Sequence, residues 1–568
     1  MLKPFDLQGL FIFLCIKVAL VTDPAAGSGN FLTESYLCLR RLENEVISLL
    51  LHGQVVIGAA MDPIKVSVAQ FYGIEINDFA ATVAKTALWI AESQMMKRTE
   101  DIVHMDLNFL PLKSYVNIVE GNALRIDWNE VVPKEKLSYI MGNPPFVGAR
   151  LMSSAQKDDV ISIFGAKWKN VGNLDYVCCW YKKAAEMMRD NAVRAALVST
   201  NSVTQGETVA NLWKPLMESG VHIDFAHRTF RWDSEASIKA HVHCVIVGFS
   251  VAPNDKPKVI YTNEMAQIAE NINGYLIDAD NVFVDSRQHP ISAVPEICIG
   301  SQPIDDGNYL FTKEEMESFI AKTPASAEYF HLWYGSQEFI NNSPRYCLYL
   351  GNCSPDVLRK MPECLKRVEA VREFRMKSNR ASTKKAAYFP AKFGMTTIPV
   401  SQFIVVPKVS SERRRYVPMG FFTPDILCSD LVFLIPSATL YHFGVLTSNV
   451  HMAWMRTVCG RLEMRYRYSK DIVYNNFPWP TPTAEQKARI EQTAQMILDA
   501  RALYPDASLA DLYDELTMPP ELRTAHQKND RAVMEAYGMS VKDTTESSCV
   551  AFLMRRYQAL TAAEGRKE

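Results

Sequence analysis

The first half of the chain alternates short apolar runs with longer helical patterns. Five runs resemble buried strands: "VALVTD", "YGIEIN", "LSYIMGN", "RAALVSTN" and "HVHCVIVGF". Helical stretches lie between them, at residues 31–51, 80–96 and 176–189. Because strands that alternate with helices form a parallel sheet covered on both faces, residues 1–285 are predicted to form an α/β domain.

The pattern changes twice after this domain. Over residues 286–480 the segments are short and irregular, with frequent prolines, glycines and aromatic residues. Helical periodicity returns from Thr483 onward, in "AEQKARIEQTAQMILDARAL" and "ELRTAHQKNDRAVMEAY", and Pro480 and Pro482 mark the boundary. We therefore expect a second domain at residues 286–480 and a helical region at residues 481–568, within the two to four domains that suit 568 residues.

One apolar stretch, "LFIFLCIKVALV" at residues 10–21, raises the question of a targeting segment. It is shorter than the ~20 residues that cross a bilayer, and Lys17 interrupts it. Cleavage as a signal peptide would destroy the glycine loop that follows, so a buried strand with its lead-in is the favoured interpretation. The 12 cysteines contain no Cys-x-x-Cys pair. We expect a reduced, cytoplasmic protein with no membrane span and no structural metal.

A glycine loop, "VTDPAAGSGNF", joins the first predicted strand to a helix. Gly27 and Gly29 allow a tight turn and a close backbone approach to a ligand, and the helix start offers free N–H groups. Glu75 ends the second strand, where a carboxylate accepts hydrogen bonds from two ribose hydroxyls. These features predict a nucleotide-like cofactor. A plain strand-to-helix turn and an ordinary surface carboxylate are the alternatives.

A second motif, Asn-Pro-Pro-Phe at residues 143–146, stops the predicted strand 138–142, because prolines cannot continue a hydrogen-bonded ladder. The glycine loop and this tetrapeptide together resemble the signature pair of amino-methyltransferases that use S-adenosylmethionine. In that family the loop holds the methionine part of the cofactor and the second motif grips a planar amino group. The resemblance implies these cofactor-binding positions: Asp23, Ala25, Gly27, Gly29, Phe31, Glu75 and Asn122. Asn122 follows the third predicted strand, in "IVEGNALRIDW".

The chemistry of an exocyclic amine explains the residue types of the tetrapeptide. The lone pair of such an amine is delocalised into the ring, and two acceptors aimed at its N–H bonds return electron density to the nitrogen. The side-chain oxygen of Asn143 and the carbonyl of Pro144 are predicted to be these acceptors. Pro144 and Pro145 fix the backbone, and Phe146 offers a face for an extruded base. A purely structural Asn-Pro-Pro turn is the alternative.

Further stretches resemble the type IIL (Mme-type) restriction-modification enzymes. They are "NLDYVCCWYKKAAE", "ALVSTNSVTQGETVANLW", "FAHRTFRWDSEA", "HMAWMRTVCGRLEMRYRYS" and "IVYNNFPWP". The order of cofactor loop, catalytic tip and long basic segment is similar to the gamma arrangement of DNA adenine-N6 methyltransferases. The resemblance implies a Rossmann-like methyltransferase domain, a mixed α/β target-recognition domain and a C-terminal helical region.

The charge of the middle domain agrees with a nucleic-acid partner, although the net charge of the whole chain is only -2. Residues 359–415 hold 15 Lys or Arg against 4 Glu and no Asp. The densest cluster is Arg413, Arg414 and Arg415, and a solvated face balanced by acidic neighbours is the alternative. In "GRLEMRYRYS", an extended Glu463 to Arg465 would project both side chains to one face and let them read one base pair. Arg461 is a further DNA-binding candidate, and Glu463 and Arg465 could instead pair with each other.

These observations lead to three hypotheses. The leading one is a site-specific DNA adenine-N6 methyltransferase that uses S-adenosylmethionine on duplex DNA. The second is a catalytically impaired DNA-binding remnant, because the segment before the glycine loop matches the family poorly. The third is an RNA or protein amino-methyltransferase. We find no convincing nuclease site before the cofactor strand, expect a monomer, and leave open whether a separate nuclease acts with the chain.

Overall fold

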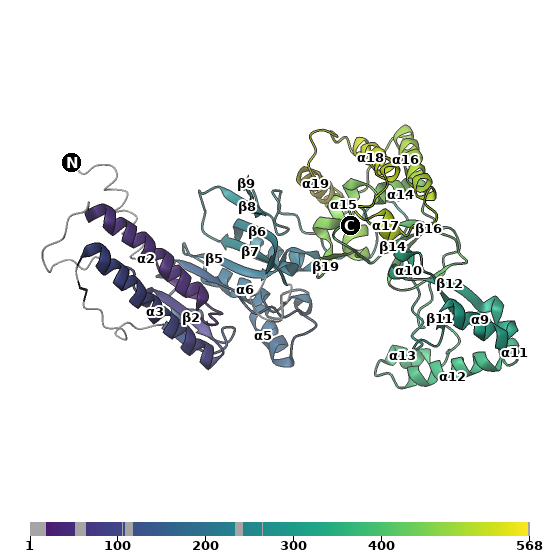
Figure 1. Cartoon of the computed structure of the whole chain (residues 1–568), viewed down its shortest axis with the longest axis horizontal. Helices are drawn as coiled ribbons and strands as arrows, with labels where there is room; N and C mark the ends of the chain where they lie inside the picture. The colour runs from purple at the N-terminus through teal and green to yellow at the C-terminus, as the bar shows by residue number, and fades with distance from the viewer. Residues whose placement is uncertain are drawn as a thin grey trace. The chain divides into compact units, whose positions relative to one another are not determined.

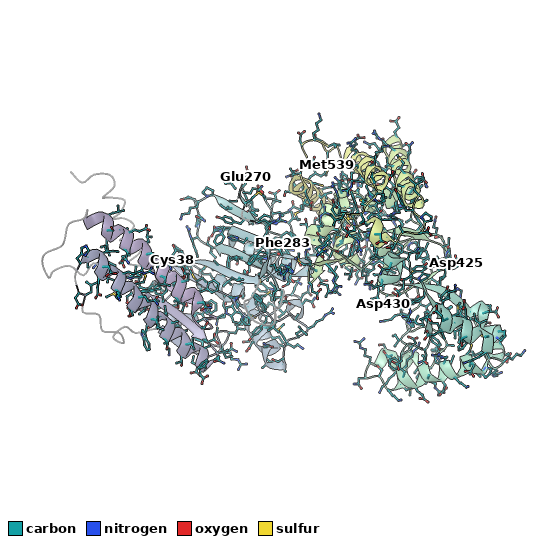
Figure 2. All side chains as sticks on the ribbon, viewed as in Figure 1. Cys38, Glu270, Phe283, Asp425, Asp430 and Met539 are labelled. Atoms are coloured by element: carbon teal, nitrogen blue, oxygen red, sulfur yellow. The ribbon has the colours of Figure 1, made fainter. Side chains whose placement is uncertain are left out.

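The computed structural model describes residues 19–51, 64–104, 106–107, 117–232, 242–263 and 265–565. The chain divides into two compact units, Met1–Phe283 and Val284–Glu568. Figure 1 traces both units, and Figure 2 labels Phe283, at which the first one ends. Most of the apolar lead-in, at residues 10–18, lies outside the described residues. No helix in the described part of the chain is long and apolar enough to cross a membrane.

The first unit is built on one sheet with the described strand order β3-β2-β1-β4-β5-β7-β6-β8-β9. The first five of these strands are parallel, and β7 runs antiparallel to both β5 and β6. The strands are β1 (Val21–Asp23), β2 (Phe71–Glu75), β3 (Asn117–Glu120), β4 (Tyr139–Gly142), β5 (Arg194–Thr200), β6 (His222–Trp232), β7 (Val242–Ser250), β8 (Lys258–Thr262) and β9 (Met265–Ala269). The five predicted strands are thus confirmed as β1, β2, β4, β5 and β7.

Helices cover both faces of this sheet. The helices are α2 (Asn30–Leu51), α3 (Asp78–Val103), α4 (Trp128–Val131), α5 (Ser154–Phe164), α6 (Cys178–Met187), α7 (Gly206–Thr208) and α8 (Lys214–Glu218). Figure 1 shows α2 and α3 side by side, and their apolar residues share one core with β1 and β2. Ser35 on α2 contacts Met141, whereas Tyr181 on α6 bonds to Ser199. Since Met141 pairs with Ala196, Met141 and Ser199 face opposite sides, and so do the two helices.

The second unit contains three smaller sheets and a helical C-terminus. Its strands are β10 (Cys298–Ile299), β11 (Leu310–Phe311), β12 (Phe330–Tyr334), β13 (Arg345–Leu348), β14 (Phe403–Pro407), β15 (Val409–Ser410), β16 (Gly420–Phe422), β17 (Leu427–Cys428), β18 (Val432–Pro436), β19 (Gly460–Leu462) and β20 (Arg465–Arg467). They form sheets of order β10-β18-β14-β16, β11-β13-β12-β17 and β15-β20-β19. The middle of the chain is therefore mixed α/β, as expected.

The second unit also contains helices, which lie between and beside its three sheets. They are α9 (Lys313–Lys322), α10 (Ser336–Asn341), α11 (Pro355–Leu358), α12 (Pro362–Met376), α13 (Ala381–Ala386), α14 (Leu440–Leu446), α15 (Asn449–Val458), α16 (Ala484–Ala502), α17 (Leu509–Leu512), α18 (Pro520–Ala536) and α19 (Glu546–Glu564). The two helices predicted after Thr483 are confirmed as α16 and α18. In Figure 1, α12 and α13 lie at the end of the unit opposite to α16 and α18.

Candidate active site and nucleic-acid interface

The glycine loop leaves the carboxyl end of β1 and turns into α2. The Gly27 N–H donates to a carboxylate oxygen of Glu75 at 2.7 Å, which fixes the loop against the end of β2. Both glycines have positive φ, +53° at Gly27 and +80° at Gly29. A Cβ at Gly29 would lie 2.8 Å from that of Ala84, whereas a Cβ at Gly27 would meet nothing within 4 Å. Gly29 thus allows the helices to pack, and Gly27 faces open space.

Asp23 joins this loop to the strand that carries the second motif. Its side chain is buried, and one carboxylate oxygen accepts a bond from the Ala25 N–H at 2.9 Å. A Cβ at Gly142, the last residue of β4, would lie 2.3 Å from the same oxygen, so only glycine fits there. Burial raises the pKa of Asp23 to about 7, an effect that the Ala25 N–H opposes and the charge of Glu75 reinforces.

The Asn-Pro-Pro-Phe tip follows β4 directly. Asn143 is half-buried, and its side-chain oxygen is enclosed without a hydrogen-bond partner among the described residues. Pro144 is buried, Pro145 is exposed and Phe146 is half-buried. Both Asn143 and Pro145 line a cavity of about 590 Å³ that is also lined by the glycine loop and Glu75. An enclosed acceptor without a donor is unfavourable unless a ligand supplies the donor.

Six of the predicted residues line this one cavity: Ala25, Gly27, Glu75, Asn122, Asn143 and Pro145. Five others lie in or next to the same loops without lining it: Asp23, Gly29, Phe31, Pro144 and Phe146. Residues more than 110 positions apart in the sequence thus meet at the carboxyl ends of β1, β2 and β4, where ligands bind in open α/β sheets.

Asp159 lines the first cavity next to Asn122 and holds its neighbours by hydrogen bonds. It was not predicted from the sequence as a site residue. Its carboxylate accepts bonds from the Asn122 amide at 3.1 Å, the Arg125 guanidinium at 2.8 Å and the Tyr176 hydroxyl at 2.9 Å. Burial raises the pKa of Asp159, but these hydrogen bonds outweigh burial and hold the pKa below its usual range. The Asn122 oxygen accepts from the Leu124 N–H at 2.9 Å, so protein groups already engage both ends of the Asn122 amide.

The stretch "NLDYVCCW" holds both loops in place. The Asp175 carboxylate accepts from the Ala149 N–H at 2.9 Å, and the Tyr176 N–H donates to the carbonyl of Val147 at 2.9 Å. The indole N–H of Trp180 donates to the carbonyl of Pro24 at 3.0 Å. The sequence signal for these residues was their place in the family-like stretches, which gave them no individual role.

In the second unit, β19 and β20 form a hairpin that carries the predicted base readers. Glu463 has φ +58° and lies in the turn, so the condition that Glu463 to Arg465 is extended is not met. Its carboxylate pairs with Arg465 at 3.0 Å, and both side chains are exposed. The guanidinium of Arg461 lies 4.3 Å from the ring centre of Tyr466 and donates to the Met464 carbonyl at 2.9 Å.

The predicted arginine cluster follows β15, which pairs with β20 through Ser410 and Tyr466. Arg413 and Arg415 are exposed, whereas burial lowers the pKa of the half-buried Arg414, against the charge of Asp514. All three arginines line a second cavity of about 590 Å³ within this unit. This cluster therefore adjoins the hairpin, with part of its charge directed inward.

Comparison with known proteins gives a consistent result over almost the whole chain. Three family models match: the MmeI DNA-methyltransferase domain at residues 14–262, the MmeI target recognition domain at 278–481 and the MmeI C-terminal domain at 482–563. DNA methyltransferase A of Bacillus subtilis (strain 168) is 40% identical over 542 residues, which are 95% of this chain and 61% of that protein. The chain thus spans less than two thirds of that relative.

A solved structure gives the second comparison. The type IIL restriction-modification enzyme MmeI in complex with DNA is 44% identical, with a TM-score of 0.89 over 98% of this chain and 75% of that one. A sequence identity of 44% over most of both chains is evidence of common descent and not of a shared fold alone. The chain therefore belongs to the MmeI family of type IIL restriction-modification enzymes.

Proposed function

We propose that this chain is a site-specific DNA methyltransferase that transfers a methyl group from S-adenosylmethionine to the N6 amino group of adenine in duplex DNA. The observation that carries the proposal is the first cavity, in which the glycine loop and Glu75 face the unpaired oxygen of Asn143. Membership of the MmeI family supports the DNA-methyltransferase class, and a relative of the chain was solved in complex with DNA.

The cavity suits the cofactor. Gly27 leaves open space beside the loop, and the carboxylate of Glu75 lies at the end of β2 within reach of a ribose. Bound there, S-adenosylmethionine supplies a methyl group on a sulfonium, which is reactive without a metal or a covalent enzyme intermediate. Asp159 keeps the Asn122 wall fixed through its three hydrogen bonds.

The tip acts on the acceptor amine. The side-chain oxygen of Asn143 and the carbonyl of Pro144 accept hydrogen bonds from the two N–H groups of the adenine amino group, which localises its lone pair for attack on the sulfonium methyl. The S–CH3 bond breaks as the N–CH3 bond forms, and the methylated amine then loses one proton to solvent. Pro145 restricts the backbone so that both acceptors stay aligned. Phe146 provides an apolar face for the base, which must leave the duplex to reach the cavity.

We assign the contacts to DNA to the second unit, because residues 278–481 match a target recognition domain. We assign base reading to Glu463 and Arg465 and backbone contacts to Arg461 and the Arg413–Arg415 cluster. We further infer that the chain acts as a cytoplasmic monomer. A separate nuclease as its companion remains a proposal that co-purification from the native host would test.

The deciding experiment is methyl transfer by the purified chain. Labelled cofactor is offered with duplex DNA, RNA and protein in competition, and the product base is identified by chromatography. We expect label in N6-methyladenine of duplex DNA alone. Saturable cofactor binding without transfer, or no cofactor binding at all, would favour the impaired remnant. Label in RNA or protein would favour the third hypothesis.

A further inference from the structure

Two large aromatic side chains are exposed directly after α13. Tyr388 is 76% exposed and Phe389 is 66% exposed, on adjacent residues. Their backbone is ordered, because the Tyr388 N–H donates to the carbonyl of Lys385 and the Phe389 N–H to that of Ala386. An adjacent pair of exposed aromatic residues on a folded turn indicates a surface that binds a partner.

A buried arginine makes this turn rigid. The side chain of Arg375, on α12, is fully buried and donates five hydrogen bonds to backbone carbonyls. The carbonyls belong to Pro303, Ile304, Ala386, Phe389 and Lys392. The last three lie in or beside the aromatic turn. The Tyr309 hydroxyl adds a bond of 2.7 Å to the carbonyl of Pro390. The backbone that carries the aromatic pair is thus fixed before any partner binds, which lowers the entropy cost of binding.

Five cations lie close to the pair in the sequence. They are Lys377, Arg380, Lys384, Lys385 and Lys392, all exposed, and no Asp or Glu occurs from residue 377 to 392. Within the part of the chain that the structure describes, none of the five forms an ion pair. In the preceding segment some cations pair with acidic residues three positions away, as Lys366 does with Glu363 and Arg372 with Glu369.

We propose that residues 377–392, the aromatic–lysine turn, form a second DNA-binding element, separate in sequence from the hairpin and the arginine cluster. The lysines contact backbone phosphates, and Tyr388 and Phe389 insert as an apolar pair into the adjoining groove. Duplex DNA is the partner that satisfies both features, since exposed cations match a phosphate backbone while an aromatic pair on a fixed backbone packs on sugars and bases. This inference rests on the proposed DNA-binding function.

Duplex binding by the full-length chain, measured by fluorescence anisotropy over a range of salt, tests the element. Lys384→Gln with Lys385→Gln is expected to lower the slope of log affinity against log salt by about 0.9 for each phosphate that the variant no longer neutralises. Tyr388→Ala with Phe389→Ala is expected to weaken binding roughly tenfold or more without changing that slope. Lys366→Gln with Arg372→Gln removes the same charge from neighbouring exposed positions, and this control should leave slope and affinity close to those of the unaltered chain.

The outcomes separate the two proposals. If the unaltered chain binds duplex DNA and methylates it, but both turn variants keep its affinity and slope, this inference is refuted and the proposed function stands. A control variant as impaired as the lysine variant would equally refute it, because the effect would then reflect net charge alone. A change in oligomeric state on sedimentation, with DNA affinity unaltered, would assign the aromatic pair to a second copy of the chain. Failure of the unaltered chain to bind DNA would refute both.

Discussion

Replacing Asn143 with Ala separates catalysis from stability. An unpaired buried acceptor costs roughly 1–3 kcal/mol, and the oxygen of Asn143 is enclosed without a partner. Its removal therefore offsets the reduced packing of a half-buried side chain, and we expect the free energy of unfolding to change by less than about 1 kcal/mol. Loss of one preorganised partner of the reacting group should nevertheless slow methyl transfer roughly 100- to 1000-fold, or about 2.7–4 kcal/mol.

Single-turnover transfer of labelled methyl groups measures the rate, and urea unfolding measures stability. Asn143→Asp is the matched control, because it has nearly the same size and retains an acceptor oxygen, so it should keep much more activity than the Ala variant. Affinities for cofactor and DNA should stay within about threefold for both, since neither change alters the glycine loop or the second unit. Transfer by the Ala variant at the normal rate would refute the role of Asn143. Reduced stability together with the absence of cofactor binding would assign it a structural role.

Three further substitutions test the remaining parts of the site. Gly27→Val forces a β-branched residue to φ +53° and fills the open cavity space, so cofactor affinity in equilibrium dialysis should fall at least about tenfold, and unaltered affinity would exclude the loop. Asp23 has its pKa raised in the folded state from 3.8 to about 7, so its proton stabilises the fold at low pH and that contribution is lost as the pH rises through 7. Asp23→Asn should consequently gain stability relative to the unaltered chain as the pH rises from about 4 to about 7 in urea titrations, by up to about 4 kcal/mol, and the difference should then stay constant, whereas a pH-independent difference would contradict the buried carboxyl. Glu463→Lys with Arg465→Asp keeps an ion pair in the turn and should change the preferred base pair, and long-read sequencing that finds the same methylated site would eliminate this assignment.

The strands and the two signature motifs were predictable because their signals are local. An apolar run that ends in Asp-Pro or Asn-Pro-Pro indicates where the strand ends. The order of the two motifs along the chain then predicts that both lie at the same edge of the sheet. The hairpin turn was not predicted because it carries no such local signal. Its central residues are Glu463 and Met464, which lack the Asn or Gly that normally announces a positive φ. Among the described residues, β19 pairs with β20, and β20 also pairs with β15.

Side chains that act across the fold gave no local signal. Asp159 lies in an ordinary helix, and only the folded chain brings it to Asn122. Arg375 was counted with 14 other cations as part of one basic segment, yet it is internal and binds carbonyls. Composition gives the total charge of a segment but does not show which cations face solvent. The structure therefore removes Arg375 from the surface charge of this segment and leaves the exposed cations of the aromatic–lysine turn among those that can contact DNA.

The position of the tip relative to the cofactor loop depends on contacts from a third segment. Trp180 holds the carbonyl of Pro24 in the glycine loop, and Tyr176, four residues earlier, holds the carbonyl of Val147 just after the tip. Asp23 packs against Gly142 between them. Because the start of α6 bonds to both loops, neither loop can shift without breaking a buried hydrogen bond or moving the helix. Under the proposed function, this arrangement sets the distance between methyl donor and amine before the base arrives, and alignment of that kind lowers the barrier to direct transfer.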